Sequence, residues 1–244
     1  MNNKLKSTLL AAVLTVSGIG AAQAEDDWEY DIAPFYIWAV GLEGESQIGP
    51  VTAPISLEFE DVLDNLEGIF TVHFEGRKGQ HGFLFDITHV KLDPETVTPE
   101  GVPVGVDLTN QIIELGGIYQ PQSGGPLEVL YGLRWSNFEL DGTFGPVPTT
   151  TLVDENWWDA FVGLRGLAQV SDNIDFTYRG DIGAGDSDLT WSAALLFHWS
   201  FADNWTAIGG YKWLDYDFKT GSGPDRFTYD IRYEGPALGV SYSW

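Results

Sequence analysis

Cysteine is absent from this chain of 244 residues, which excludes disulfides, thiolate metal sites and thiol nucleophiles. Methionine occurs once, and basic residues number only 12 against 36 acidic ones. So acidic a chain is not suited to binding nucleic acid through phosphate contacts, and it carries no basic anchor for anionic lipid. No long apolar run follows the N-terminal region, and the mean hydropathy is −0.09. A helical membrane protein is therefore excluded.

The first 24 residues have the three parts of a secretory signal peptide. Lys4 and Lys6 form a positive region, residues 9–16 form a short apolar run, and residues 22–24 form an A-x-A cleavage site. The alternative, an N-terminal membrane anchor, needs an apolar run of ~20 residues. We therefore expect cleavage after Ala24. It leaves one domain, residues 25–244, with 10 basic and 36 acidic residues and a formal charge of −26.

Ten segments of the mature chain show the period-two alternation of β-strands. They are residues 28–40, 69–77, 82–92, 104–119, 127–140, 156–170, 173–185, 190–202, 205–218 and 226–244. Tight turns alternate with longer loops, which we expect near residues 93–103, 141–155, 186–189 and 219–225. Residues 41–68 are less regular, with a short strand at 55–59 and helical spacing over 60–67. We expect this segment to form the largest loop or to fold into the mouth of the structure.

Several tryptophans lie near the ends of these segments, among them Trp158, Trp205 and Trp244. Aromatic rings at strand ends are typical of the interface girdles of membrane barrels. The sequence therefore predicts an all-β fold, an antiparallel up-and-down transmembrane β-barrel of about 10 strands, with 8 to 12 strands left open. A soluble all-β domain is the alternative, because its strands would alternate in the same way.

The last eight residues, 237–244, alternate between apolar and small or polar side chains and end on an aromatic ring. They resemble the C-terminal assembly signal of bacterial outer-membrane β-barrels through Gly239, Tyr242 and Trp244, although Ala237 replaces the usual polar residue. With the general alternation, the mature chain resembles the broad class of small opacity-like and OmpA-like porin barrels. The resemblance implies the outer membrane of a Gram-negative bacterium as the location. It also implies outer-membrane lipid, lipopolysaccharide and the barrel-assembly machinery as partners.

Charged residues gather on the strand faces opposite the apolar ones. The predicted inward set is Glu75, Arg77, Asp86, Glu114, Glu128, Arg134, Asp159, Arg165, Asp175, Arg179 and Asp181. A ten-strand bore is narrow, so opposite charges should pair, and we expect Arg165 and Arg179 to pair with the inward aspartates. Such a network predicts a closed barrel with a structural role or slight passive permeability. The alternative is a narrow, cation-preferring channel.

His198 and Ser200 lie two residues apart on one strand face, an H-x-S pattern that resembles outer-membrane lipid A deacylases. The resemblance implies a hydrolase as a further alternative. Its third group is missing, because the next glutamate is Glu234 and only Asp203 and Asp215 could replace it. We therefore expect a non-enzymatic protein without cofactor or metal centre. The acidic loops could still gather divalent cations, and Asp181, Asp186 and Asp188 are the candidate Ca²⁺ ligands.

Overall fold

The computed structural model describes residues 27–93, 95–97, 103–145 and 148–244, so the predicted signal peptide lies outside the described residues. Its strands are β1 (Glu29–Trp38), β2 (Gly41–Ile48), β3 (Val51–Leu57), β4 (Leu66–Lys78), β5 (His81–Leu92), β6 (Glu95–Val97), β7 (Pro103–Tyr119), β8 (Leu127–Phe144), β9 (Thr150–Ser171), β10 (Ile174–Gly185), β11 (Leu189–Ala202), β12 (Trp205–Thr220) and β13 (Phe227–Ser243). Two short helices, α1 (Phe59–Asp64) and η1 (Gly223–Asp225), complete the described elements. None of the helices in these ranges is long and apolar enough to cross a membrane.

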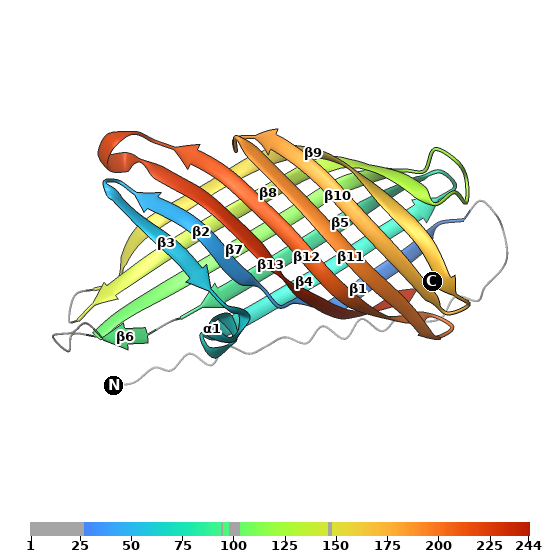
Figure 1. Cartoon of the computed structure of the whole chain (residues 1–244), viewed down its shortest axis with the longest axis horizontal. Coiled ribbons are helices and arrows are strands. Elements are labelled where there is room, and N and C mark those ends of the chain that lie inside the picture. The colour runs from blue at the N-terminus through green and yellow to red at the C-terminus, as the bar shows by residue number, and fades with distance from the viewer. Residues whose placement is uncertain (1–26, 94, 98–102, 146–147) are drawn as a thin grey trace.

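Ten strands close into an antiparallel barrel, which confirms the predicted fold class. The order is β1-β4-β5-β7-β8-β9-β10-β11-β12-β13, and β13 pairs with β1 to close the ring (Figure 1). Tight turns and the C-terminus share one end of the barrel, which we call the turn end. The opposite end, which holds the β2–β3 hairpin and helix η1, is called the loop end.

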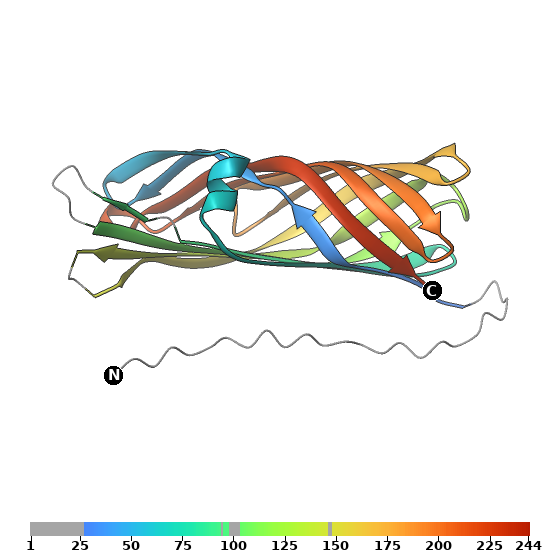
Figure 2. The same cartoon turned by 90° about the horizontal axis from the view of Figure 1, so that it is seen from below.

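Residues 41–68 are more regular than expected. β2 pairs with the loop-end half of β13, and β3 pairs with β2, so these residues widen the sheet instead of forming a long loop. Helix α1 confirms the helical spacing predicted there and lies beside the barrel wall between β3 and β4 (Figure 2). The chain passes from β1 to β2 against Gly235, where an added Cβ would lie 1.7 Å from the carbonyl oxygen of Ala39. Only glycine fits this crossing.

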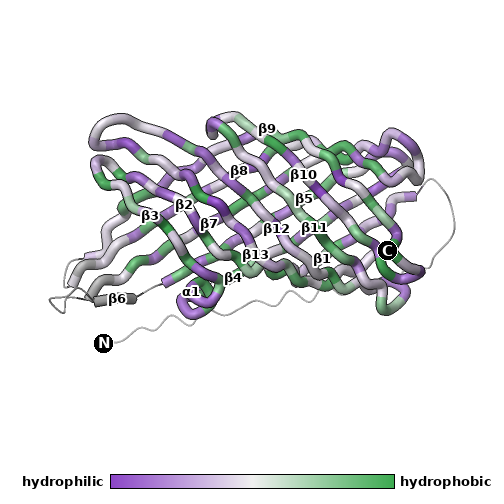
Figure 3. Tube along the Cα trace, in the orientation of Figure 1, coloured by the Kyte–Doolittle hydropathy of each residue, from purple (hydrophilic) through white to green (hydrophobic). Residues whose placement is uncertain are grey.

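The loop expected at 141–155 is wrong in extent, because β8 continues to Phe144 and β9 begins at Thr150. The physical reason is that the two strand faces exchange polarity partway along the strands. The outer face changes from apolar to polar, and the inner face changes from polar to apolar. On β12 the outward residues run from Trp205 to Trp213 and then change to Asp215 and Asp217. Figure 3 shows the underlying alternation as green and purple segments along the strands.

The reversal occurs at the same register on neighbouring strands. One row of paired outward residues is apolar: Val72, Ile87, Ile113, Trp135 and Trp158. The next outward row toward the loop end is mostly polar: Phe70, His89, Gln111, Asn137 and Asn156. The barrel thus has an apolar outer band in its turn-end half and a largely polar outer surface in its loop-end half.

Candidate functional site

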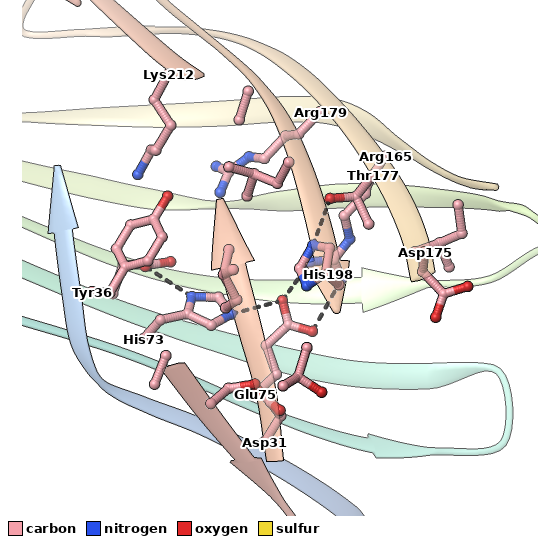
Figure 4. A pocket seen from close by; sticks show the side chains of 18 of the residues that line it. Asp31, Tyr36, His73, Glu75, Arg165, Asp175, Thr177, Arg179, His198 and Lys212 are labelled. Carbon is pink, nitrogen blue, oxygen red and sulfur yellow. Dashed lines mark hydrogen bonds and ion pairs between the residues drawn. The ribbon is translucent and has the colours of Figure 1, made fainter. Parts of the chain in front are cut away.

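The turn-end half of the bore contains a cavity of about 760 Å³. Its lining extends from the turn at 120–126 up to Leu214 and is rich in charged side chains (Figure 4). The cavity borders two clusters of ion pairs, each built from two arginines and two carboxylates. Each cluster is neutral overall, which limits the cost of holding charges away from bulk water.

The cluster nearer the turn end joins strands from opposite sides of the bore. Arg165 on β9 contacts Glu75 on β4, and its Nε lies 2.6 Å from Oε2 of Glu128 on β8. Arg77 contacts the same two carboxylates, with 2.8 Å between its Nη2 and Glu75 Oε2. Both glutamate side chains are almost fully buried. Each of the two glutamates is therefore held by both arginines.

The second cluster lies farther toward the loop end and is more deeply buried. Arg134 Nη2 lies 2.7 Å from Glu114 Oε1 and 2.8 Å from Asp181 Oδ1. Arg179 contacts the other oxygens of both carboxylates, at 2.9 and 2.8 Å. Both guanidinium groups also lie over the ring of Phe161, within 5.6 Å of its centroid. This combination satisfies the charges from two directions and places a rigid polar layer across the middle of the bore.

The predicted inward residues are brought together, but not always in the expected pairs. Arg165 pairs with two glutamates and not with Asp159 or Asp175. Asp159 instead accepts a hydrogen bond from the backbone N–H of Ser187, at 3.0 Å. Asp175 lines the cavity without an ion pair in the described part of the chain. Partners across the bore depend on strand tilt, which the sequence does not reveal.

A histidine absent from the predicted network joins the cavity wall. His73 Nδ1 lies 2.8 Å from Asp86 Oδ1, and its Nε2 lies 3.2 Å from Glu75 Oε1 (Figure 4). His73 and Asp86 are direct neighbours in the β4–β5 register. The sequence could have predicted this contact, because both residues belong to the inward faces of a predicted hairpin. His89 faces outward and takes no part.

Lys212 and Tyr36 were also missed. The ammonium of Lys212 lies 5.0 Å from the ring centroids of Tyr36 and Trp38, and Figure 4 shows it directed toward Tyr36. No carboxylate oxygen lies within 4.0 Å of this ammonium in the described ranges. The alternation of β12 places Lys212 on the inner face with Ile208 and Leu214. The alternation of β12 alone therefore predicts that Lys212 faces the bore.

The structure does not assemble the hydrolytic group considered for His198 and Ser200. Both side chains line the cavity, but His198 Nε2 lies 2.9 Å from Thr177 Oγ1 and Ser200 Oγ lies 3.3 Å from Thr206 Oγ1. The sequence offers three acidic candidates for the third position. Asp203 is exposed in the turn between β11 and β12, and Asp215 and Glu234 lie on the outer surface. Asp215 pairs with Arg232, and Glu234 accepts from the hydroxyl of Tyr211. Without a base on the serine and an orienting acid on the histidine, this is not a triad.

The three carboxylates considered as Ca²⁺ ligands are likewise engaged separately. Asp181 belongs to the buried arginine cluster, Asp186 accepts from the backbone N–H of Trp158, and Asp188 pairs with Lys219. Another acidic group brings oxygens within 4.8 Å of one another at Glu67, Asp93 and Asp107. Lys91 already contacts the first and last of these at 2.5 and 3.8 Å. Its ammonium supplies the positive charge that such a group needs.

Above the cavity, toward the loop end, buried aromatic side chains fill the bore. Trp157 stacks on Phe218 with 4.4 Å between ring centroids and meets Tyr216 edge-on at 5.5 Å. The hydroxyl of Tyr216 lies 2.7 Å from Ser136 Oγ. The cluster continues through Phe138, Phe227, Ile231, Tyr229 and Tyr233. None of these side chains lines the 760 Å³ cavity, so the cavity ends beneath an apolar plug.

The residues of the predicted assembly signal lie where β13 meets β1. Tyr242 and Trp244 stack at 5.8 Å between ring centroids, and Trp244 exchanges two backbone hydrogen bonds with Tyr30. Gly239 is paired with Tyr36 in the same ladder. The terminal residue therefore belongs to the strand pair that closes the barrel.

No protein-family model and no curated protein matches this chain. Solved structures do match it. The outer membrane protease OmpT of Escherichia coli aligns over 92% of this chain and 99% of its own, with a TM-score of 0.52 and 8% identity. Ail, the attachment invasion locus protein of Yersinia pestis, aligns over 89% of this chain and 99% of its own, with a TM-score of 0.40 and 10% identity. The chain thus has the fold of bacterial outer-membrane β-barrels, and no particular member is identified.

Proposed function

We propose that this protein is an outer-membrane barrel with a closed lumen and a non-enzymatic role, and that it passes solutes only slightly if at all. Its outer band supports the location. On β12 the segment whose outward face is apolar runs from Trp205 to Trp213 and covers nine residues. A tilted membrane strand needs ~9–11 residues. Tryptophan stands at both ends of that stretch, where aromatic rings favour the membrane interface.

The plug is the observation that carries the closed lumen. Trp157, Tyr216 and Tyr229 are almost fully buried inside the bore, although they belong to strands from different parts of the wall. Interiors of this kind pack densely, and a hydrophobic constriction that excludes water blocks the passage of ions. The buried arginine clusters beneath it add a second obstacle. The same arrangement disfavours the cation-channel alternative.

Planar-bilayer conductance tests the proposal directly. We expect the wild-type protein to conduct little, and the double variant Trp157→Ala, Phe218→Ala to show discrete openings. These openings should favour cations, because fixed carboxylates in a narrow bore attract them. The matched control is Trp158→Ala, which truncates the neighbouring outward ring and should leave the bore closed. A large wild-type current, or anion selectivity in the double variant, would refute the proposal.

The hydrolase alternative has a separate test. Cells with the wild-type protein and cells with Ser200→Ala are compared for lipid A acylation and for esterase activity. We expect no difference, because Ser200 contacts Thr206 and has no histidine base in the described part of the chain. Activity that disappears in Ser200→Ala would make the protein an enzyme and overturn the non-enzymatic role.

A further inference from the structure

The barrel wall has a seam in its loop-end half. Pairing between β1 and β4 runs from Glu29 and Arg77 to Ala33 and His73 and then stops. Beyond that point β4 continues to Leu66, and β3 is the last strand of the sheet on the other side. No ladder joins β3 to β4 in the described ranges. Helix α1 lies over this gap, so side chains rather than backbone hydrogen bonds close the wall here.

A second cavity, of about 250 Å³, occupies the seam. Its outer members Leu63 and Ile37 are more than half exposed, whereas its inner members Leu92 and Trp38 are buried. Almost every side chain that lines it is apolar. The cavity therefore crosses the wall from the outer surface into the bore. Its outer opening lies at the loop-end limit of the apolar outer band, because Ile37 is paired with the outward residue Leu238.

The seam cavity and the charged cavity meet. Trp38, Thr88 and Ile112 line both of them. At this junction the indole N–H of Trp38 is buried without an acceptor. The ammonium of Lys212 lies over the same ring and has no carboxylate partner within the described ranges. By contrast, the four inward arginines of the two clusters are all paired.

We propose that the seam binds a single-chain fatty acid, with its alkyl chain in the seam cavity and its carboxylate at Lys212. An apolar cavity that opens onto an unpaired cation fits an amphiphile with one chain and one anionic head. The seam cavity measures about 250 Å³ and is smaller than most small-molecule sites, which measure ~300–1,000 Å³. It therefore has room for one alkyl chain and not for the paired chains of a phospholipid. The carboxylate would also supply the acceptor that the Trp38 indole lacks. This inference does not require the bore to be closed.

Photo-crosslinking locates the ligand in the full mature chain. The probe is palmitate with a diazirine in its chain, added to the folded protein in detergent micelles. We expect cross-links on α1, β1, β4, β5 and β7, which supply most of the lining of the seam cavity. Unlabelled palmitate should compete. Cross-links scattered over the whole apolar band would show partition into the micelle only and would overturn the proposal.

Two variants separate the head from the chain. Lys212→Met should weaken palmitate binding at least about tenfold and leave methyl palmitate unchanged, because a bond to a charged group is lost only with the acid. Leu108→Trp should fill the seam cavity and weaken both ligands. Lys219→Met, on the same strand but at the surface, is the matched control and should bind normally. Heat-dependent gel mobility confirms that each variant is folded. Equal palmitate binding by Lys212→Met and Lys219→Met would overturn the assignment of the head.

Discussion

Replacement of Arg134 by methionine is the sharpest test of the buried charge clusters. The wild-type side chain is fully buried and donates to Glu114, Thr190 and Asp181. Removing it leaves two buried carboxylates with Arg179 as their remaining charge partner. Breaking a buried pair on one side costs ~3–5 kcal/mol, because an uncompensated charge remains. We expect Arg134→Met to reduce the free energy of unfolding by this amount.

The control and the double variant make the reasoning refutable. Arg232→Met removes a partly exposed arginine whose Nε lies 3.0 Å from Asp215 Oδ2 and should cost less than ~1 kcal/mol. The double variant Arg134→Met, Glu114→Met restores charge balance and retains the pair of Arg179 with Asp181. It should therefore be more stable than Arg134→Met alone. Urea unfolding in lipid vesicles, followed by heat-dependent gel mobility, measures all four proteins. Equal losses for Arg134→Met and Arg232→Met would refute the argument.

Three further predictions concern the closing strand pair, the close backbone contact at Gly235 and the arginine cluster nearer the turn end. Trp244→Ser should impair assembly far more than Ser243→Ala, measured as folded protein in the membrane fraction; equal amounts would contradict a role for the terminal ring. Gly235→Ala should cost ~1–3 kcal/mol in unfolding because its Cβ would overlap the backbone, whereas Gly68→Ala, with no atom within 4 Å, should cost much less. Arg165→Ala should destabilise the barrel without opening a conducting path, and a large current would place the barrier at the arginines and not at the plug.

The sequence alone predicts the fold class and about 10 strands, with 8 to 12 left open, and the barrel has ten. Alternation with period two survives in every strand because one face meets the bore and the other the surroundings. It also indicates many of the charged residues that face inward, although His73 and Lys212 are absent from the predicted set. Arg165 and Glu75 illustrate what it could not show. They are 90 residues apart and lie on strands that are not neighbours, so their contact depends on barrel tilt and shear.

The reversal of the two faces was the main feature that sequence reasoning missed. Local alternation is symmetric, so a strand with an apolar interior and a polar exterior looks like one with the opposite arrangement. In 141–155 the exchange of polarity between the two faces makes the segment look irregular and suggests a loop. Trp157 shows the consequence, because it follows the inward face of β9 but belongs to an apolar core and not to a charged lumen.

The register of the reversal gives it a physical meaning. Counted from the turn end toward the loop end, Trp213 is the last apolar outward residue of β12. It is paired with Glu234, which is the first polar outward residue of β13 in the same direction. The same change occurs between the rows Trp135–Trp158 and Asn137–Asn156 on β8 and β9. Where the exterior is apolar, the interior must hold the charges that define the cavity. Where the exterior is polar, the apolar residues turn inward and supply the packing of an ordinary protein core. The plug and the charged cavity are therefore consequences of one boundary, whose height on the strands sets how deeply the barrel would sit in a membrane.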